Sequence, residues 1–599
     1  MPAKSPVTDI KKLSLSVTVS VNGAAISDNG GILSIKVTHE INRISYAEII
    51  LTGDSVESGS LPLSDGTDFT PGNDIEVTVA YADNTEESIF KGVIVKHGIE
   101  IASSSTVQLK VTCKHKAVAM TFNRKEQQYA TKLDSDIISS IVSTYGLSAT
   151  VDATTTTQEL IYQKLSTDWD FIMSRAEFYG YIITMDGTSI TVGKPKFDGT
   201  AVLAITLGES ILSFDAELNL EKQPPSLDAS AWDIKNQALL KSTAEEPSLN
   251  SQGNVTAKTL SGKLSQTKLS LNIATPMEQT ELKSWADGML LKLRMAALKG
   301  KVSFLGNASV KTGNLITLAG VGDKFNGDAF VTYVQHVIEK GKWKTVTKFG
   351  LDYKPIHERV DFAYPAAVGQ LPPINTLQVA TVTKIFEDPQ SQYRIMVNIP
   401  SNAETSVGLW ARMATNYATA DAGFVFLPEV GDEVLIGYLE NDPRYPVILG
   451  SLYSNAKKPP VESSDNNNYT KTIVTKSKLK VTFDDEKKVI TIVTPGGNSL
   501  TISDDAKSIE LKDQNSNSIK MSSDGINLES AKDISIKATG NITLNATGKL
   551  TMSATQDAAL SGMNVNLTAQ VGFTGKGNAT AEVSASGQTT VKGGIVMIN

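Results

Sequence analysis

The residues whose types could support chemistry are few and scattered along the chain. Cys113 and His115 share one face of a predicted strand, a spacing that could begin a metal site. No second close pair of ligands accompanies them, so strand packing is the favoured interpretation, and we predict no metal and no other cofactor. No histidine belongs to an HExxH or comparable zinc pattern. The histidines are His39, His97, His115, His336 and His357.

The carboxylates and glycines also favour structural interpretations. Glu387-Asp388 precedes a proline and reads as a turn, whereas general-acid catalysis needs two carboxylates held across a cleft. Gly320/Gly322 and Gly496/Gly497 fit no phosphate-binding loop. The stretch from Pro428 to Val434 could suggest a site, but proline, glycine and alternating acids more often build a strand-turn-strand unit. We therefore predict no catalytic residue.

The most regular element is a repeat near the C-terminus with a period close to eight. From Gly525, pairs of apolar residues spaced by two recur every eight residues, so each pair lies on one face of a short extended strand. After Leu560 the register slips by one and then fades. This pattern is typical of a β-solenoid. The pairs are Ile526/Leu528, Ile534/Ile536, Ile542/Leu544, Leu550/Met552 and, more weakly, Ala558/Leu560.

Eight extended residues span roughly 26 Å, enough for one wall of a triangular prism but too short for a closed coil. Either three octads of one chain close each coil, or three chains contribute one octad each. One chain would yield only a stubby solenoid with exposed ends, whereas three intertwined chains would form a long shaft without an open sheet edge. We favour the intertwined trimer over the single-chain coil and over a disordered Ser/Thr/Ala-rich tail.

Composition restricts the class of protein. Of 599 residues, 40% are hydrophobic and 20% charged, as in globular chains, and no apolar run approaches the eighteen residues of a membrane span. The N-terminus lacks the apolar core of a signal peptide, and one cysteine excludes an intrachain disulfide. We therefore expect synthesis in the cytoplasm. The net charge of −8, without a basic stripe, argues against nucleic-acid binding.

Strand-like and helical patterns divide the chain into four parts. Residues 1–370 are strand-rich, with helices expected near 134–145, 167–179 and 277–298. A Pro-marked joint leads to residues 371–455, whose five or six short strands suit an OB-like barrel. Residues 456–471 read as a polar linker. Residues 472–599 hold the predicted needle, and the fold class is mainly β.

Two stretches carry a resemblance to a known family. The longer stretch runs from Gly408 to Tyr453, and the shorter is STDWDFIMSRAEFYGYII. This order of parts resembles the VgrG-type spike proteins of contractile injection systems, which are similar to the fused hub and needle of contractile phage tails. In the longer stretch the matching residues are Trp410, Ala411, Arg412, Pro428, Glu429, Gly431, Asp432, Glu433, Val434, Arg444, Pro446, Val447, Gly450, Ser451, Leu452 and Tyr453. In the shorter stretch they are Ser166, Asp168, Phe171, Arg175, Ala176, Glu177 and Gly180.

The resemblance implies that residues 1–370 form a hub of two tube-like β-barrels with helical insertions. Three chains would then match a hexameric inner tube. It also implies an OB-like barrel and an intertwined trimeric β-helix needle at residues 472–599. Some relatives carry a lysozyme or effector domain, but Ser454 to Thr470 is too short to fold as one, and the sequence ends at Asn599. We therefore expect a structural spike and no enzyme.

The terminal sequence GGIVMIN would place apolar residues at the end of the needle. An exposed apolar end is a liability unless it is covered, and the resemblance suggests a small PAAR-like tip protein as the cover. The alternative is that these residues close the core of the trimer itself. The expected interface comprises Gly593, Gly594, Ile595, Val596, Met597, Ile598 and Asn599.

The sequence thus predicts a homotrimeric spike that caps an inner tube, contacts baseplate proteins and punctures a target envelope, touching its membrane only transiently. It would be assembled into an injection particle and expelled or released by contraction or lysis, with effector cargo as an additional partner. The injection system to which the spike belongs could be a type VI secretion system, an extracellular particle or a phage. The rival interpretations are a trimeric tailspike enzyme that degrades polysaccharide, and an adhesin.

Overall fold

The computed structural model describes residues 14–26, 31–54, 61–81, 85–103, 106–234, 236–264, 267–351, 353–358, 371–400 and 408–598. The chain divides into two compact units, residues 1–451 and 452–599. Among the described residues, no helix combines the length and the apolar content needed to cross a bilayer.

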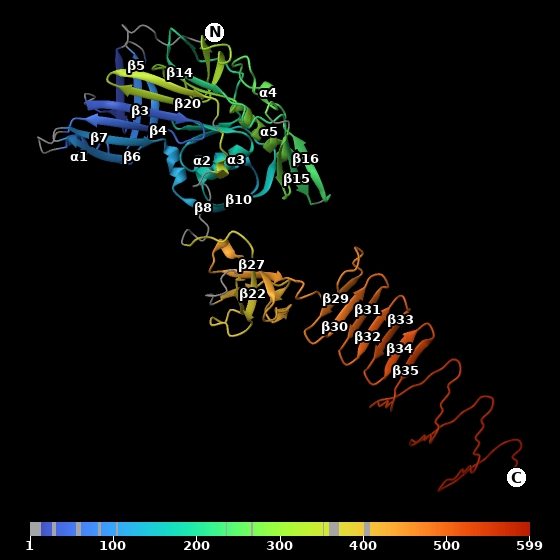
Figure 1. Ribbon diagram of the computed structural model, residues 1–599. Coiled ribbons are helices and arrows are strands. Elements are labelled where there is room, and N and C mark those ends of the chain that lie inside the picture. The colour runs from blue at the N-terminus through green and yellow to red at the C-terminus, as the bar shows by residue number, and fades with distance from the viewer. Residues whose placement is uncertain are drawn as a thin grey trace. The chain divides into compact units, whose positions relative to one another are not determined.

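Most strands of the first 350 residues join one thirteen-stranded sheet in the order β14-β18-β21-β20-β3-β4-β7-β6-β5-β1-β2, with β13 and β19 attached through β20 (Figure 1). The strands are β1 (Leu15–Val21), β2 (Ala24–Ala25), β3 (Ile32–Glu40), β4 (Tyr46–Thr52), β5 (Asp74–Tyr81), β6 (Glu87–Ser103), β7 (Thr106–Lys114), β13 (Leu203–Thr206), β14 (Ile211–Leu218), β18 (Leu298–Leu305), β19 (Leu315–Ala319), β20 (Gly327–Glu339) and β21 (Lys342–Phe349).

The antiparallel pair β3–β20 joins the two halves of this sheet, with His39 opposite Val334 and Val37 opposite His336. Each half has its own hydrophobic core: Ile49 and Phe90 belong to the first, Phe304 to the second. The sequence expectation of two tube-like barrels agrees with two cores. The strands nevertheless form one continuous sheet, and the division into two barrels stays a prediction.

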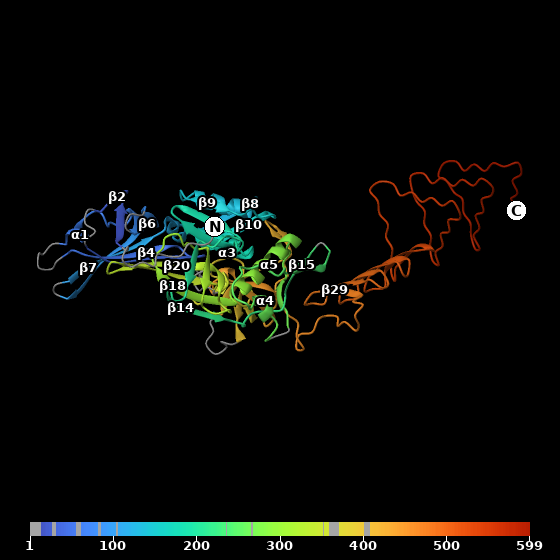
Figure 2. The same cartoon turned by 90° about the horizontal axis from the view of Figure 1, so that it is seen from above.

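Two insertions pack against this sheet. The first contains β8 (Arg124–Leu133), α2 (Asp134–Ser143), β9 (Ser148–Val151), β10 (Thr157–Thr167), α3 (Asp168–Phe178), β11 (Ile182–Asp186) and β12 (Ser189–Gly193). The second contains β15 (Leu227–Asp233), β16 (Ala238–Thr243), α4 (Ala257–Leu260), β17 (Leu269–Ile273) and α5 (Gln279–Met295). Helices α2, α3 and α5 occupy the stretches near 134–145, 167–179 and 277–298. Helix α5 lies beside β15 (Figure 2) and packs against β15 and β16 through Leu282, Ala286 and Leu290.

Outside these layers, α1 (Pro62–Asp65) and the 3-10 helices η3 (Lys116–Thr121) and η4 (Ile356–Glu358) are short connections. The next part of the chain is a closed five-stranded barrel in the order β22-β23-β24-β28-β27. Its core is small and aliphatic, including Val397, Ala411 and Ile436. The barrel strands and their hairpin are β22 (Gln378–Lys384), β23 (Arg394–Asn398), β24 (Leu409–Met413), β25 (Ala418–Thr419), β26 (Ala422–Gly423), β27 (Glu433–Tyr438) and β28 (Pro446–Ser451), with η7 (Leu439–Asn441) between the last two.

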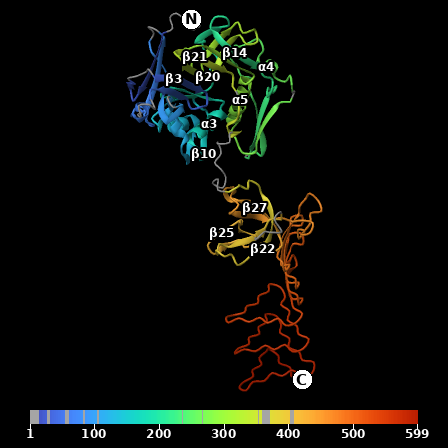
Figure 3. The ribbon, with the colours of Figure 1, turned by 60° about the vertical axis from the view of Figure 1, so that its left-hand side comes forward.

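The second unit begins as a seven-stranded antiparallel meander in chain order (Figure 1). Its strands are β29 (Thr470–Val474), β30 (Lys480–Asp484), β31 (Val489–Val493), β32 (Ser499–Ser503), β33 (Ser508–Lys512), β34 (Ser518–Ser522) and β35 (Gly525–Glu529). Residues 530–598 follow as successive extended excursions without a strand paired inside this chain (Figures 1 and 3). A single chain therefore shows a meander at residues 470–529, and the intertwined β-helix stays a prediction.

Candidate functional site

One face of the β29–β35 meander is apolar except for Lys471 on its first strand, which lies opposite Phe483. The register aligns them across neighbouring strands: Ile490 lies opposite Ile502, which lies opposite Ile509 on the next strand. The opposite face is polar, with Thr491, Thr501 and Glu510 forming the matching row. We call the apolar side the apolar face; it comprises Ile473, Val481, Phe483, Ile490, Ile492, Leu500, Ile502, Ile509, Leu511, Ile519, Met521, Ile526 and Leu528.

This apolar face is uncovered in the single chain. Ile492 is 43% exposed and Leu511 51% exposed, although both lie in the middle of a regular sheet. A lone antiparallel sheet with one apolar side is unstable in water unless another layer covers that side. A contiguous exposed apolar patch of this kind marks an association surface.

The turns of the meander repeat every nineteen residues, a period that differs from that of the octads and was not predicted from the sequence. The turns beginning at Thr494 and Asp513 are related by this shift (513 − 494 = 19). The amide oxygen of Asn498 accepts a hydrogen bond of 3.1 Å from the backbone N–H of Gln514, and Asn517 accepts one of 3.2 Å from Ala531. Each Asn side chain thus ties its own turn to the next turn on the same edge of the sheet.

The octads after residue 529 continue the apolar pattern without a partner in the chain. Ile536 is 69% exposed and Leu544 67% exposed. The predicted tip residues 593–598 are described and exposed, with Met597 at 84%. Asn599 lies outside the described residues. Exposed extended segments of this kind leave backbone groups available for pairing with other chains.

The two sequence signatures of the barrel, Trp410–Arg412 and Pro428–Val434, have structural roles. Ala411 of the Trp410-Ala411-Arg412 strand is fully buried in the barrel core. In the Pro428–Val434 signature, Gly431 adopts φ +87° and donates its backbone N–H to the carbonyl of Val382 at 2.8 Å. The N–H of Glu429 donates to the carboxylate of Asp432 at 2.9 Å. The signature is therefore a strand-turn-strand unit.

Asp388 likewise organises a turn of the barrel. The guanidinium of Arg394 donates to its carboxylate at 2.6 Å, and the backbone N–H of Gln392 donates at 2.7 Å. These hydrogen bonds, that from Arg394 foremost, hold the pKa of Asp388 well below its usual range. A carboxylate kept ionised in this way is a poor general acid.

The segment resembling the hub motif is held inside the first insertion and contacts α5 of the second insertion. Asp168 accepts hydrogen bonds from Lys125 and Tyr145, both at 2.6 Å. Burial raises the pKa of Asp168, but these hydrogen bonds outweigh burial and lower it overall. Gly180 adopts φ +70° where the chain passes Gly288 of α5, and a Cβ at Gly180 would lie 2.6 Å from the Cα of Gly288.

Cys113 and His115 lie at the end of strand β7, where packing and a local hydrogen bond position them. Strand β7 ends at Lys114, so His115 leaves the strand and its Nδ1 accepts a hydrogen bond from the N–H of Ala117 at 3.1 Å. Cys113 is fully buried, and burial raises the pKa of its thiol to about 12. Within the described ranges, no three His, Cys, Asp or Glu side chains are grouped to hold a metal ion.

His39, His115 and His336 instead line one cavity of about 340 Å³ in the hub sheet, a grouping that sequence reasoning missed because they lie far apart in the chain. His39 Nδ1 lies 3.0 Å from Ser45 Oγ, and its Nε2 lies 2.9 Å from the carbonyl oxygen of Ile89. Burial lowers the pKa of His115 to about 4 and that of His336 to about 3. Burial lowers the pKa of His39 as well, so the neutral form is favoured at all three histidines.

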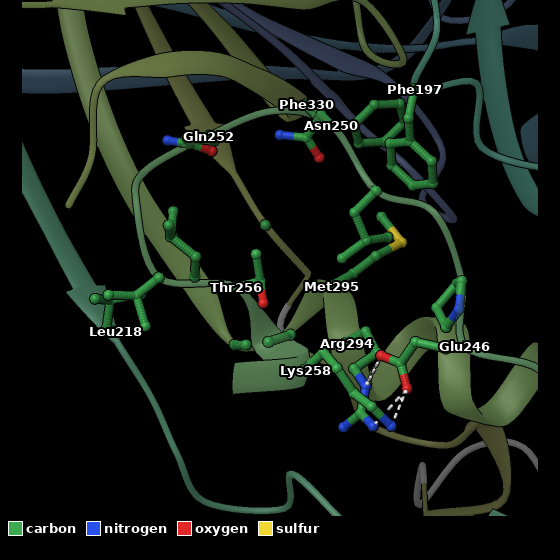
Figure 4. Close-up of a pocket in the computed structure, with 17 residues that line it drawn as sticks. Phe197, Leu218, Glu246, Asn250, Gln252, Thr256, Lys258, Arg294, Met295 and Phe330 are labelled. Atoms are coloured by element: carbon green, nitrogen blue, oxygen red, sulfur yellow. Dashed lines mark hydrogen bonds and ion pairs between the residues drawn. The ribbon is translucent and has the colours of Figure 1, made fainter. Parts of the chain in front are cut away.

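A second cavity of about 250 Å³ lies between α5 and the strands β18 and β20 (Figure 4). Met295, Phe330 and Phe197 form its apolar wall. At its polar end, Arg294 donates two hydrogen bonds to Glu246, of 2.6 and 3.0 Å. Lys258 lies 3.2 Å from the same carboxylate. This ion-paired cluster ties α4 and α5 to the extended segment around residue 246.

Comparisons with known proteins assign families to three regions. Residues 11–340 match the Alg8 N-terminal domain, and residues 378–453 match the type VI secretion system/phage-baseplate injector OB domain. Residues 489–599 match the phage baseplate V C-terminal trimerisation domain. The apolar face thus lies largely within the trimerisation family, and the closed barrel coincides with the OB family.

Individual relatives are distant or match only short stretches. The type VI secretion system spike protein VgrG5 of Pseudomonas aeruginosa is 39% identical over 64 residues, 11% of this chain and 8% of that protein. The actin cross-linking toxin VgrG1 of Vibrio cholerae is 29% identical over 112 residues, 17% of this chain and 10% of that protein. The matched stretches thus span about a tenth or less of these relatives.

Among solved structures, the 43 kDa tail protein of prophage MuSo2 from Shewanella oneidensis is 11% identical with a TM-score of 0.43, covering 57% of this chain and 99% of that chain. The E. coli c3393 protein, described as a component of the type VI secretion system, is 12% identical with a TM-score of 0.36, covering 72% of this chain and 99% of that chain.

Proposed function

The chain belongs to the family of the Alg8 N-terminal domain and is a distant homologue of VgrG and phage-baseplate spike proteins, and from this premise we propose that it acts as the homotrimeric spike of a contractile injection system. It is a baseplate or spike component with a trimerisation domain. The spike would cap the inner tube through residues 1–370 and puncture the target envelope with residues 472–599.

The apolar face carries this proposal. Three copies of the meander, each with one apolar and one polar side, can close a three-walled prism with the apolar sides inward. The octads would extend the same prism as an intertwined β-helix, since each contributes one strand with two inward apolar residues. In an interlocked trimer no strand can be withdrawn singly, so unfolding is slow, as a puncturing device requires.

The proposed role is mechanical. Sheath contraction would supply the work and the spike would supply stiffness, so the chain needs no catalytic site of its own. The turns tied by Asn498 and Asn517 suit such a shaft, because they link successive hairpins along one edge. Effector cargo and contacts with baseplate proteins are part of the proposal.

At the needle end, residues 593–599 would bind a PAAR-like tip protein. Ile595 and Met597 are 82% and 84% exposed, and three such ends would create an apolar patch that a small cone-shaped protein can cover. Binding of a purified PAAR-like protein would be compared between the wild type and the double variant Ile595→Asp/Met597→Asp, with Lys592→Ser as the control. Equal binding by all three would contradict this tip site.

Native mass spectrometry of the full chain tests the trimer. We expect a mass of three times 64.1 kDa, and loss of the trimer when the chain is truncated after Asn498. A stable monomer at micromolar concentration would refute the spike. Association of the trimer with a hexameric tube protein, followed by electron microscopy, then tests the hub end.

A further inference from the structure

The OB barrel exposes a second apolar surface apart from the needle. Residues 424–427, with the sequence Phe-Val-Phe-Leu, follow the β25–β26 hairpin and belong to no helix or strand. Val425 is 81% exposed and Phe426 62% exposed. In the described part of the chain, no backbone hydrogen bond engages the N–H of Val425, Phe426 or Leu427. Four consecutive apolar residues that are exposed to water in this way indicate a surface that binds another apolar surface.

The position of residues 424–427 in the barrel indicates which surface could cover them. The segment connects β24 to β27, and the register sets Val434 of β27 opposite Ser451, the last residue of β28. Residues 424–427 therefore lie toward the barrel end from which the chain leaves for the trimerisation domain. β29 begins at Thr470, so this short tether keeps three barrels close together whenever the needle is assembled.

A matching surface exists on the outer side of the same barrel. Leu377, Val379 and Leu449 are exposed by 57%, 39% and 50%. Between two of them lies Gly437, where an added Cβ would meet Leu377 at 3.2 Å and Leu449 at 3.6 Å. We call this surface the leucine face. A cyclic trimer built from head-to-tail contacts needs two different complementary patches on every chain, and this barrel presents two.

We propose that, in the trimer, residues 424–427 of each chain pack against the leucine face of the barrel of the next chain. This inference rests on the proposed trimer and adds an interface outside the needle. Three such contacts would close a ring of barrels at the base of the needle. The contact is apolar on both sides, and its benefit is removal of aromatic and aliphatic surface from water.

Cysteine crosslinking of the full chain tests this arrangement. In Phe426→Cys/Val379→Cys, a short bismaleimide should join each chain to both neighbours and yield covalent trimers on denaturing gels. The control Phe426→Cys/Tyr445→Cys carries its second thiol in the turn between β27 and β28, outside the leucine face, where Tyr445 is 55% exposed. The control should yield no covalent trimer. Wild-type protein, whose only thiol is the buried Cys113, reports the background.

The outcomes separate this inference from the proposed function. Covalent dimers from Phe426→Cys alone would mean that the 424–427 segments meet one another at the axis, which overturns the pairing with the leucine face. A trimer by native mass without crosslinking would overturn the interface and leave the spike intact. A monomer by native mass would overturn both.

Discussion

The guanidinium of Arg175 in α3 donates two hydrogen bonds, of 2.6 and 2.9 Å, to the carboxylate of Asp134 at the start of α2. Asp134 is fully buried, and the hydroxyl of Tyr179 donates a third hydrogen bond to it at 2.7 Å. A buried carboxylate is tolerated only when it is paired in this way. The ion pair therefore fixes how α2 and α3 pack in the first insertion.

Removing Arg175 should destabilise the hub strongly. Arg175→Ala leaves Asp134 buried with one hydrogen bond, and breaking a buried pair costs roughly 3–5 kcal/mol. Urea unfolding followed by tryptophan fluorescence would measure the loss. Lys311→Ala breaks the Lys311–Asp186 pair, whose side chains are 51% and 66% exposed, and should change stability by less than about 1 kcal/mol. Equal effects of the two variants would contradict this account.

Position 180 should tolerate no side chain, because Gly180 lies directly against Gly288. Gly180→Ala places a Cβ 2.6 Å from Gly288 in a backbone conformation that disfavours alanine. Gly146→Ala is the matched control, because its φ of +68° is similar but nothing lies within 4 Å. We expect Gly146→Ala to lower the free energy of unfolding by about 1 kcal/mol. Gly180→Ala should lower it by about 1–3 kcal/mol more. Thermal unfolding midpoints measure both, and equal midpoints would refute the steric argument.

The hub should lose stability on acidification. Burial lowers the pKa of His115 to about 4 and of His336 to about 3, so the unfolded chain binds protons at higher pH than the folded chain. The stabilisation is complete above the unfolded pKa of about 6.5 and is lost as pH falls below it. By pH 5 the loss is about 2 kcal/mol per histidine.

Urea unfolding at pH 7 and pH 5 would measure this dependence. His336→Asn should shrink the difference between the two pH values, because asparagine does not titrate while it keeps a polar group near Thr345. An unchanged difference in this variant would exclude His336 as a cause of the acid sensitivity.

The two faces of the β29–β35 meander should respond oppositely to an added charge. Ile492→Asp places a carboxylate on the apolar face, where burial in the trimer would cost on the order of 3 kcal/mol per chain. The neighbouring Thr491→Asp places the same charge on the polar side and should leave the trimer intact. Sedimentation at micromolar concentration distinguishes the two. A trimer that survives Ile492→Asp would show that the apolar face is not the trimer core.

Cys113 should be inert in the folded protein. Its thiol is buried and its pKa is raised to about 12, so the reactive thiolate is almost absent at pH 8. Mass spectrometry after iodoacetamide treatment should show no alkylation of native protein and full alkylation in urea. Fast native alkylation would mean that the β4–β7–β6 region of the hub sheet opens readily.

The local pattern of the chain was enough to anticipate much of this molecule. Apolar alternation and turn residues predict the strands of the barrel, and the amphipathic run at 277–298 predicts α5, which spans Gln279–Met295. The octads from Ile526 onward already favour three intertwined chains over a coil closed by one chain. Such features depend only on neighbours within a few residues, so a sequence displays them directly.

Other features were decided only by tertiary structure. The β3–β20 pairing joins residues almost 300 positions apart and merges the hub strands into one sheet, and it brings His39 and His336 to one cavity. The ion pair of Arg175 with Asp134 and the approach of Gly180 to Gly288 likewise join distant segments. These contacts form only when whole helices and strands pack together. Packing between distant segments produces no periodic pattern in the sequence from which the contacts could be predicted.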